Sequence, residues 1–247
     1  DRCVEWAAAR LVGDVQRRCS AYERCKTAKP ELLDATLQRG DVLRVEGNQK
    51  VSAAIKYLTQ ATWAHAAIYV GDGLRKPEHG ADYPCLVEAI VGTGVEAVPL
   101  SRYATFNTRI CRAVDLRDED RDRIVAYAVA RIGHKYDTRN IFDLARYLLP
   151  LPPVPVRWRR RMLAIGSVDP PRAICSTMIA EAFQKVGYPI LPFVSDADDP
   201  TPRVRSTYSE REILHIRHHS LFAPRDFDVS PFFQIVKPTI AAGFDYK

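Results

Sequence analysis

The sequence lacks several features that would place it in a large class of proteins. No stretch approaches the roughly 20 consecutive apolar residues of a membrane-spanning helix, so no transmembrane helix is predicted. We find no internal repeat and no nucleic-acid-binding motif, and the net charge of +6 is too modest to indicate a nucleic-acid partner. No charged-then-apolar leader follows Asp1, so we expect any targeting segment to have been removed or never to have existed. We favour the cytoplasm or a membrane periphery, and no signal in the sequence decides the compartment.

Closely spaced cysteine pairs are also missing. The six cysteines stand at positions 3, 19, 25, 85, 111 and 175, in a chain too long to depend on disulfides for its stability. We therefore expect reduced thiols, with Cys85 and Cys111 in the cores of strands.

The chain shows no convincing metal site. His215, His218 and His219 have one-turn spacing, but no carboxylate or cysteine lies near them with ligand spacing. The sequence therefore predicts no metal and no cofactor.

What the chain does contain is typical of a globular enzyme. Its 247 residues are 47% hydrophobic and 27% charged, enough to bury a full core. Hydrophobic periodicity predicts helices over 4–22, 51–60, 118–131, 140–148 and 175–185, the last ending at Gly187, and strands over 41–46, 65–71, 85–91, 94–99, 108–115 and 232–236. Pro30 is expected to end a helix. Strands followed by helices in this order predict an α+β fold with an antiparallel sheet.

Cys175 carries the clearest chemical indication in the chain. Residues 173–183 (AICSTMIAEAF) predict a helix that begins at the cysteine itself. The N–H groups of a first helical turn are unpaired, so they favour a thiolate and leave a donor for a substrate oxyanion. We therefore expect Cys175 to be a nucleophile.

A base and an orienting carboxylate are found in two predicted strands. His65 begins the first strand, which is followed by a predicted hairpin turn at 71–73, and Glu88 stands among apolar residues in the next strand. If the strands pair antiparallel, His65 and Glu88 can share one face. A carboxylate beside an imidazole fixes its tautomer and supports its charged form, which completes a nucleophile, base and orienter set.

These segments resemble a known enzyme family. Residues 64–73 (AHAAIYVGDG) look like the histidine strand of NlpC/P60 papain-like cysteine hydrolases, and 132–137 (IGHKYD) with 174–176 (ICS) look like their tyrosine and cysteine segments. The histidine precedes the cysteine here. That order resembles the circularly permuted branch with YiiX/YaeF-like proteins and, more distantly, lecithin:retinol acyltransferase. Residues 37–43 (LQRGDVL) and the amphipathic segment 51–59 also fit that branch.

The resemblance implies a papain-like fold and roles for particular residues. Cys175 would be the nucleophile, His65 the base and Glu88 the polar third residue, while Tyr136 would line the active site. We also expect Trp63, Trp158 and Arg157 near the substrate. The function implied is a cysteine hydrolase that cleaves an amide, peptide or acyl-ester bond through an acyl-enzyme. The alternatives are an acyltransferase of the same mechanism and a catalytically silent module that binds lipid or peptide.

Each of these residues also has a purely structural interpretation. A single cysteine in an apolar helix is usually a small buried hydrophobe, and a histidine at a strand end is usually a hydrogen-bonded structural residue. Glu88 has an equivalent alternative as a buried carboxylate paired with an arginine such as Arg112.

The expected organisation has three parts: an N-terminal helical segment over 1–36, a catalytic core over 37–190 with an insertion at about 149–172, and a C-terminal extension over 191–247 that packs on the core. Residues 150–165 of the insertion carry Arg157, Trp158 and three further arginines among prolines and aliphatic residues. It would suit an anionic membrane surface or an acidic substrate, or would be a solvated loop that balances the acidic run at 195–199. We expect a small-molecule, peptide or lipid substrate and no nucleic-acid partner.

Overall fold

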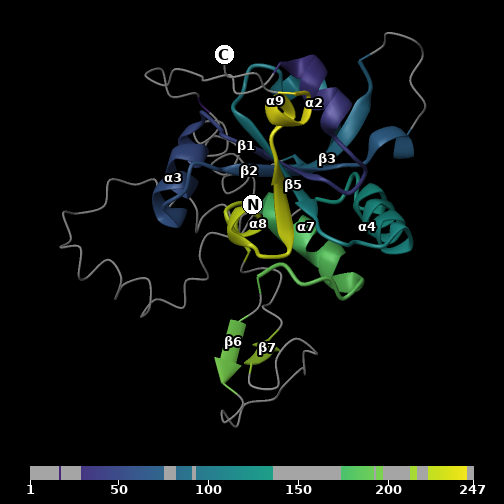
Figure 1. Ribbon diagram of the computed structural model, residues 1–247. Coiled ribbons are helices and arrows are strands. Elements are labelled where there is room, and N and C mark those ends of the chain that lie inside the picture. The colour runs from purple at the N-terminus through teal and green to yellow at the C-terminus, as the bar shows by residue number, and fades with distance from the viewer. Residues whose placement is uncertain are drawn as a thin grey trace, which may run out of the picture.

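A six-stranded antiparallel sheet forms the centre of the computed structural model (Figure 1). The structure describes residues 17, 29–74, 82–90, 93–135, 174–191, 193–196, 212–215 and 222–243. The strands lie in the order β4-β3-β2-β1-β5-β8. Their bounds are β1 Val42–Val45, β2 His65–Tyr69, β3 Pro84–Ile90, β4 Gly94–Pro99, β5 Thr108–Ala113 and β8 Phe233–Val236. The predicted α+β fold with an antiparallel sheet is therefore confirmed.

Side-chain alternation along the strands produces two apolar clusters, one on each face of the sheet. On one face, Val42, Ala66 and Ile68 pack with Met178 and Phe183 of the helix α7 (Ile174–Lys185) and with the helix α4 (Asp118–Ala130). On the other face, Leu43, Val45, Ala67 and Tyr69 pack with Leu33 of the helix α2 (Pro30–Thr36). Helices thus cover both faces, and α7 lies directly over β2 and β3.

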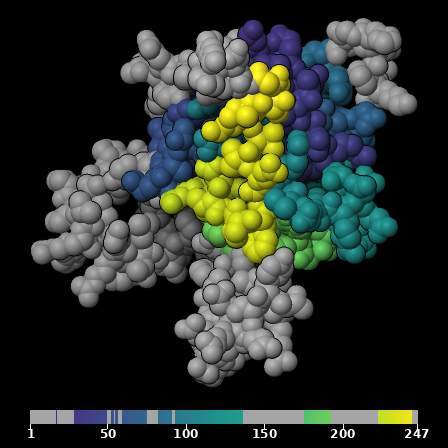
Figure 2. Space-filling view, in the orientation of Figure 1, coloured from purple at the N-terminus to yellow at the C-terminus, as the bar shows by residue number. Residues whose placement is uncertain are grey.

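The C-terminal part of the chain completes this architecture. The helix α8 (Asp226–Val229) leads into β8, which pairs with β5 at the edge of the sheet, and the helix α9 (Pro238–Ala241) then packs beside α2. In Figure 2 residues 222–243 form one continuous yellow band across this face of the molecule. Phe227 and Phe233 of this segment stack edge-on, and Phe233 also stacks against Phe183 of α7.

Most predicted elements agree with the structure to within about two residues. The remaining described elements are the helix α3 (Lys50–Thr59), the 3-10 helices η1 (Gly71–Gly73) and η2 (Leu100–Tyr103), and a separate two-stranded sheet of β6 (Phe193–Asp196) and β7 (Glu212–His215). Gly187, with φ of +71°, follows α7 in the left-handed conformation that its sequence predicts. Cys85 and Cys111 are free and buried in strands, as expected. No described helix is long and apolar enough to cross a membrane.

Two local predictions differ from the structure. The segment 71–73, predicted as a hairpin turn, is the 3-10 helix η1. It follows Val70, whose N–H donates to the carbonyl of Cys85, and β3 begins only at Pro84. Pro30 begins α2 rather than only ending an earlier helix, since a proline suits the first helical position, where its missing N–H would have no partner.

Several predicted segments lie outside the described residues. They are the helices over 4–22 and 140–148, most of the insertion between α4 and α7, and the histidines at 218 and 219.

Candidate active site

The register of β2 and β3 brings His65 and Glu88 together. Ala67 lies opposite Glu88 in this antiparallel pair, so His65, two residues earlier, faces the same side as the carboxylate. The Nε2 atom of His65 lies 2.5 Å from Oε2 of Glu88. The Glu88 side chain is fully buried, whereas the His65 side chain is 20% exposed. Because Nε2 faces the carboxylate, Nδ1 is the ring nitrogen left for another partner.

Cys175, in the first turn of α7, meets His65 where β2 and β3 separate. The N–H of Val70 donates to Cys85 of β3, so the N–H groups of even-numbered residues in β2 point toward β3. The pairing ends at Ala67 and Glu88, and the N–H of Ala66 donates to the Cys175 sulfur. The same sulfur hydrogen-bonds to the His65 imidazole. The structure thus places the thiol, the imidazole and the carboxylate in one hydrogen-bonded row.

The electrostatics of this row favour a charged pair. Burial raises the pKa of the Cys175 thiol, but the His65 charge, the hydrogen bond to His65 and the N–H of Ala66 together lower it below its usual value. Burial also lowers the pKa of His65, yet the negative charges of Cys175 and Glu88 outweigh that effect and raise it to about 10. Both shifts favour a thiolate beside an imidazolium, the reactive form of a cysteine nucleophile.

Glu88 is kept ionised by a second layer of contacts. Burial raises its pKa, but His65, the Tyr103 hydroxyl and Arg102 together lower it. Tyr103 of η2 donates to Oε2, and Nε of Arg102 lies 3.4 Å from Oε1. Arg102 also donates to Glu96, which stands opposite Glu88 in β4, so it offsets the repulsion between two facing carboxylates.

The alternative partner expected for Glu88 is not its partner in the structure. Arg112 of β5 binds Asp41 through Nε and Nη2, at 2.9 and 2.7 Å, and also donates to the carbonyl of Thr36. Among the described residues, the buried carboxylate of Glu88 therefore faces His65, Tyr103 and Arg102 instead.

A family comparison agrees with this geometry. Residues 36–147 match a family described as permuted papain-like amidase enzymes, YaeF/YiiX, the C92 family. Over these residues the chain is similar to the permuted papain-like family. The matched residues contain His65, Glu88 and Tyr103, while Cys175 follows them in sequence, so its assignment depends on the contacts above.

Two further comparisons add little to that result. A crystal structure described as the metalloprotein YiiX from Escherichia coli O157:H7 is similar at 15% identity, with a TM-score of 0.46, over 81% of this chain and 96% of that chain. We draw no conclusion from a likeness at that level. No curated protein matches this chain. The described ranges contain no cluster of three or more histidine, cysteine or acidic residues that could hold a metal ion.

Sequence patterns alone do not find every residue of this candidate site. Arg102 and Tyr103 stand in a 3-10 turn 14 and 15 residues after Glu88, where no periodicity points to the strand. Ser176 is fully buried with its Oγ 3.9 Å from the Cys175 sulfur, and only its position beside the cysteine in sequence could have indicated it.

The expected substrate-binding residues are only partly described. Trp63 is 4% exposed and lies under the guanidinium groups of Arg44 and Arg109. Tyr136, Arg157 and Trp158 lie outside the described residues, so their expected roles stay predictions.

Removing the Tyr103 hydroxyl should slow the reaction without stopping it. Tyr103→Phe deletes one donor to the Glu88 carboxylate, and a hydrogen bond to a charged group contributes about 1.5–3 kcal/mol. If part of this hydrogen-bond energy holds His65 in place through Glu88, kcat/KM should fall about tenfold while the iodoacetamide reactivity of Cys175 persists. Kinetics on the variant and a pH profile of kcat check this.

Tyr188→Phe is a suitable control for that substitution. The Tyr188 hydroxyl donates to the carbonyls of Val114 and Phe232, at 2.7 Å each, on the C-terminal side of α7. Its loss should lower stability but not kcat/KM. An equal drop in activity in both variants would mean that Tyr103 has only a structural role.

Proposed function

We propose that this protein is a cysteine amidase or peptidase that acts through an acyl-enzyme. The observation that carries the proposal is the row of Cys175, His65 and Glu88, in which the pKa of the thiol is lowered and that of the imidazole is raised. A buried structural cysteine would show the opposite tendency, as Cys85 does, whose pKa burial raises to about 11. The amidase description of the matched family supports the same reading.

In the proposed reaction the Cys175 thiolate attacks the carbonyl carbon of an amide. The negative charge moves to the carbonyl oxygen, where N–H groups of the first turn of α7 can stabilise it. His65 then gives the proton on Nδ1 to the leaving amine as the C–N bond breaks, which leaves a thioester on Cys175. Water, deprotonated by the now neutral His65, attacks that thioester, releases the carboxylic acid and regenerates the thiolate.

Glu88 acts on the reaction through His65. Its carboxylate accepts from Nε2, so it directs Nδ1 toward the sulfur and stabilises the imidazolium that the ion pair requires. Tyr103 and Arg102 in turn hold the carboxylate, and neither is expected to touch the substrate carbonyl.

We favour an amide over an ester as the bond that is cleaved. The matched family supports an amidase, whereas the resemblance to lecithin:retinol acyltransferase and the acyl transfer that it implies stay predictions. The anionic membrane surface also stays a prediction, because the arginines on which it rests lie outside the described residues.

The proposal is tested by trapping the acyl-enzyme. The full chain would be mixed with a panel of short peptides, muropeptides, acyl esters and lipids, quenched in acid and analysed by peptide mass spectrometry. We expect the acyl mass on the peptide that contains Cys175, and a larger yield from amide substrates than from lipids. Adducts spread evenly over Cys85, Cys111 and Cys175, or turnover with no cysteine adduct at all, would contradict the mechanism. The absence of both adduct and turnover would favour a silent binding module.

A further inference from the structure

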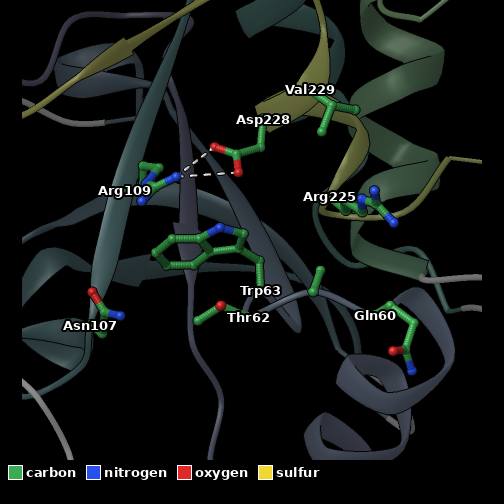
Figure 3. Close-up of a pocket in the computed structure, with 9 residues that line it drawn as sticks. Gln60, Thr62, Trp63, Asn107, Arg109, Arg225, Asp228 and Val229 are labelled. Carbon is green, nitrogen blue, oxygen red and sulfur yellow. Dashed lines mark hydrogen bonds and ion pairs between the residues drawn. The ribbon is translucent and has the colours of Figure 1, made fainter.

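A cavity of about 330 Å³ opens beside the first residues of β2 (Figure 3). We call it the Trp63 cavity. Its walls include Gln60 and Trp63 before β2, Asn107 and Arg109 of β5, and Arg225 and Asp228 near α8. None of these residues takes part in the row formed by Cys175, His65 and Glu88.

Two arginines lie close together at the Trp63 side of this cavity, where their positive charges favour the binding of a negatively charged group. Arg44 and Arg109 stand directly opposite each other on β1 and β5, and like charges in that position repel. Both bind the same atom, Oδ1 of Asp228, at 2.9 Å. Both guanidinium groups also lie over the Trp63 ring, 4.6 and 4.9 Å from its centroid. One carboxylate therefore serves two cations.

The buried member of this pair is incompletely satisfied. Arg44 is fully buried, and its Nε and Nη2 atoms make no hydrogen bond in the structure described. Burial lowers its pKa to about 10, and the positive charge of Arg109 acts in the same direction. A buried cation with free donors is costly unless a further negative charge lies near it.

Arg225 adds a third cation on the opposite wall. Its Nη1 donates to the carbonyl of Thr59 at 3.0 Å, and no described carboxylate pairs with it. Arg109 uses only Nη1 to bind Asp228, so its Nε and Nη2 can donate elsewhere. Figure 3 shows the Trp63 ring between the Arg109–Asp228 pair and the backbone of the chain that leads to Gln60, with Arg225 across the opening.

We propose that the Trp63 cavity binds one oxyanion group of the substrate, a phosphate or a carboxylate. Arg225 and the free nitrogens of Arg109 would donate to it, and the buried charge of Arg44 would act on it through the Trp63 ring. Trp63 precedes His65 by two residues, a span of at most about 7 Å of extended backbone, so the bound anion would lie close to the reacting carbonyl. The claim that the bound anion is part of the substrate rests on the proposed function. The claim that the cavity binds a free anion does not.

The experiment measures anion binding directly by calorimetry on the full chain at low ionic strength. Inorganic phosphate is one probe, and an N-acetyl dipeptide with a free carboxylate, compared with its amide, is the other. We expect at least one probe to bind, and the tighter of the two identifies the group. If the chain binds neither phosphate nor the carboxylate peptide at millimolar concentration, the proposal is overturned.

Two variants of one exposed residue make the test specific. Val229 lines the cavity and is 48% exposed, so Val229→Asp adds a negative charge without removing a polar contact, and Val229→Asn adds nearly the same shape without charge. The anion affinity should fall about tenfold or more in Val229→Asp and in Arg225→Gln, but not in Val229→Asn. Arg123→Gln removes one positive charge from a side chain that is 74% exposed on α4, and should leave binding unchanged. Equal losses in Arg123→Gln and Arg225→Gln would overturn the proposal in favour of general charge attraction.

Kinetics separate this proposal from the proposed function. If phosphate binds to the wild type and not to Val229→Asp, yet no amide is cleaved, the cavity stands and the hydrolase proposal fails. If amides are cleaved at the same KM with or without an anionic group, and phosphate neither binds nor inhibits, the hydrolase stands and the cavity proposal fails. Joint success predicts that the probe that binds more tightly raises KM and leaves kcat unchanged.

Discussion

Cys175→Ala and His65→Ala are each expected to reduce kcat/KM by roughly three to six orders of magnitude, the range seen when a nucleophile or its base is removed. The first variant has no atom to form the thioester. The second leaves the thiol without the positive charge that keeps it ionised and without a proton for the leaving amine. Turnover would be measured on whichever amide substrate yields the Cys175 adduct.

Glu88→Gln should be much milder than either of these variants. Its amide oxygen can still accept from Nε2 of His65, although the full negative charge that raises the pKa of the imidazole is lost. Partial activity is therefore expected. Full activity in this variant would mean that another group orients the imidazole.

Cys85→Ala is the matched control for the nucleophile. Cys85 is as buried as Cys175 but lies in β3 within the cluster on the α2 side of the sheet. Its loss should lower the free energy of unfolding by the cost of a small buried cavity and leave kcat/KM unchanged. Thermal melting of each variant separates loss of fold from loss of chemistry. Normal turnover in His65→Ala with an intact fold would refute the mechanism.

Iodoacetamide is expected to alkylate Cys175 at neutral pH far faster than Cys85 or Cys111. The pKa of Cys175 is lowered, mainly because the His65 charge and its hydrogen bonds outweigh burial, whereas burial raises the pKa of the other two thiols. Since the thiolate is the reacting species, the rate at Cys175 should rise with pH through a midpoint below 9 and then level off. Mass spectrometry of peptides after timed labelling measures the rate at each cysteine.

The sign of the pH dependence distinguishes labelling from turnover. Alkylation needs only the thiolate, so it should not fall again at high pH. Hydrolysis also needs the proton on His65, which is lost as the pH rises through about 10, so kcat/KM should rise, level off and then fall. In His65→Ala the alkylation midpoint should move upward, because only the hydrogen bonds from Ala66 and Ser176 then oppose the effect of burial on the thiol pKa. Equal labelling of all three described cysteines at neutral pH would count against an activated nucleophile.

Local sequence patterns predict a large part of this fold and of the site. Short apolar runs rich in β-branched residues locate most of β1 to β5, because strands that are covered on both faces are apolar almost throughout. The alternation of side chains along a strand predicts that His65 and Glu88 share a face once their strands pair. The helix that carries Cys175 is indicated by its own periodicity.

Patterns of this kind fail where a residue's partner is decided by a turn. Tyr103 reaches Glu88 only because η2 follows β4 and turns back over β3, and a 3-10 turn has no apolar period that would indicate it. Arg112 was an equally good partner for Glu88 by charge alone. The strand register places Arg112 of β5 opposite Gln234 of β8. There the Arg112 guanidinium binds Asp41 instead of Glu88.

By itself, then, the sequence predicts most strands and helices of the core, the face that His65 and Glu88 share, and the three side chains proposed for the reaction. Only the tertiary structure decides that Cys175, 87 residues after Glu88 in the chain, enters the opening where β2 and β3 separate. Tertiary packing likewise brings Arg109 and Arg225 from distant segments to one cavity, with Arg44 over the Trp63 ring that lines it. The physical reason is that periodicity reports burial of one element at a time, whereas a site depends on distances between elements, which are set by the packing of the core.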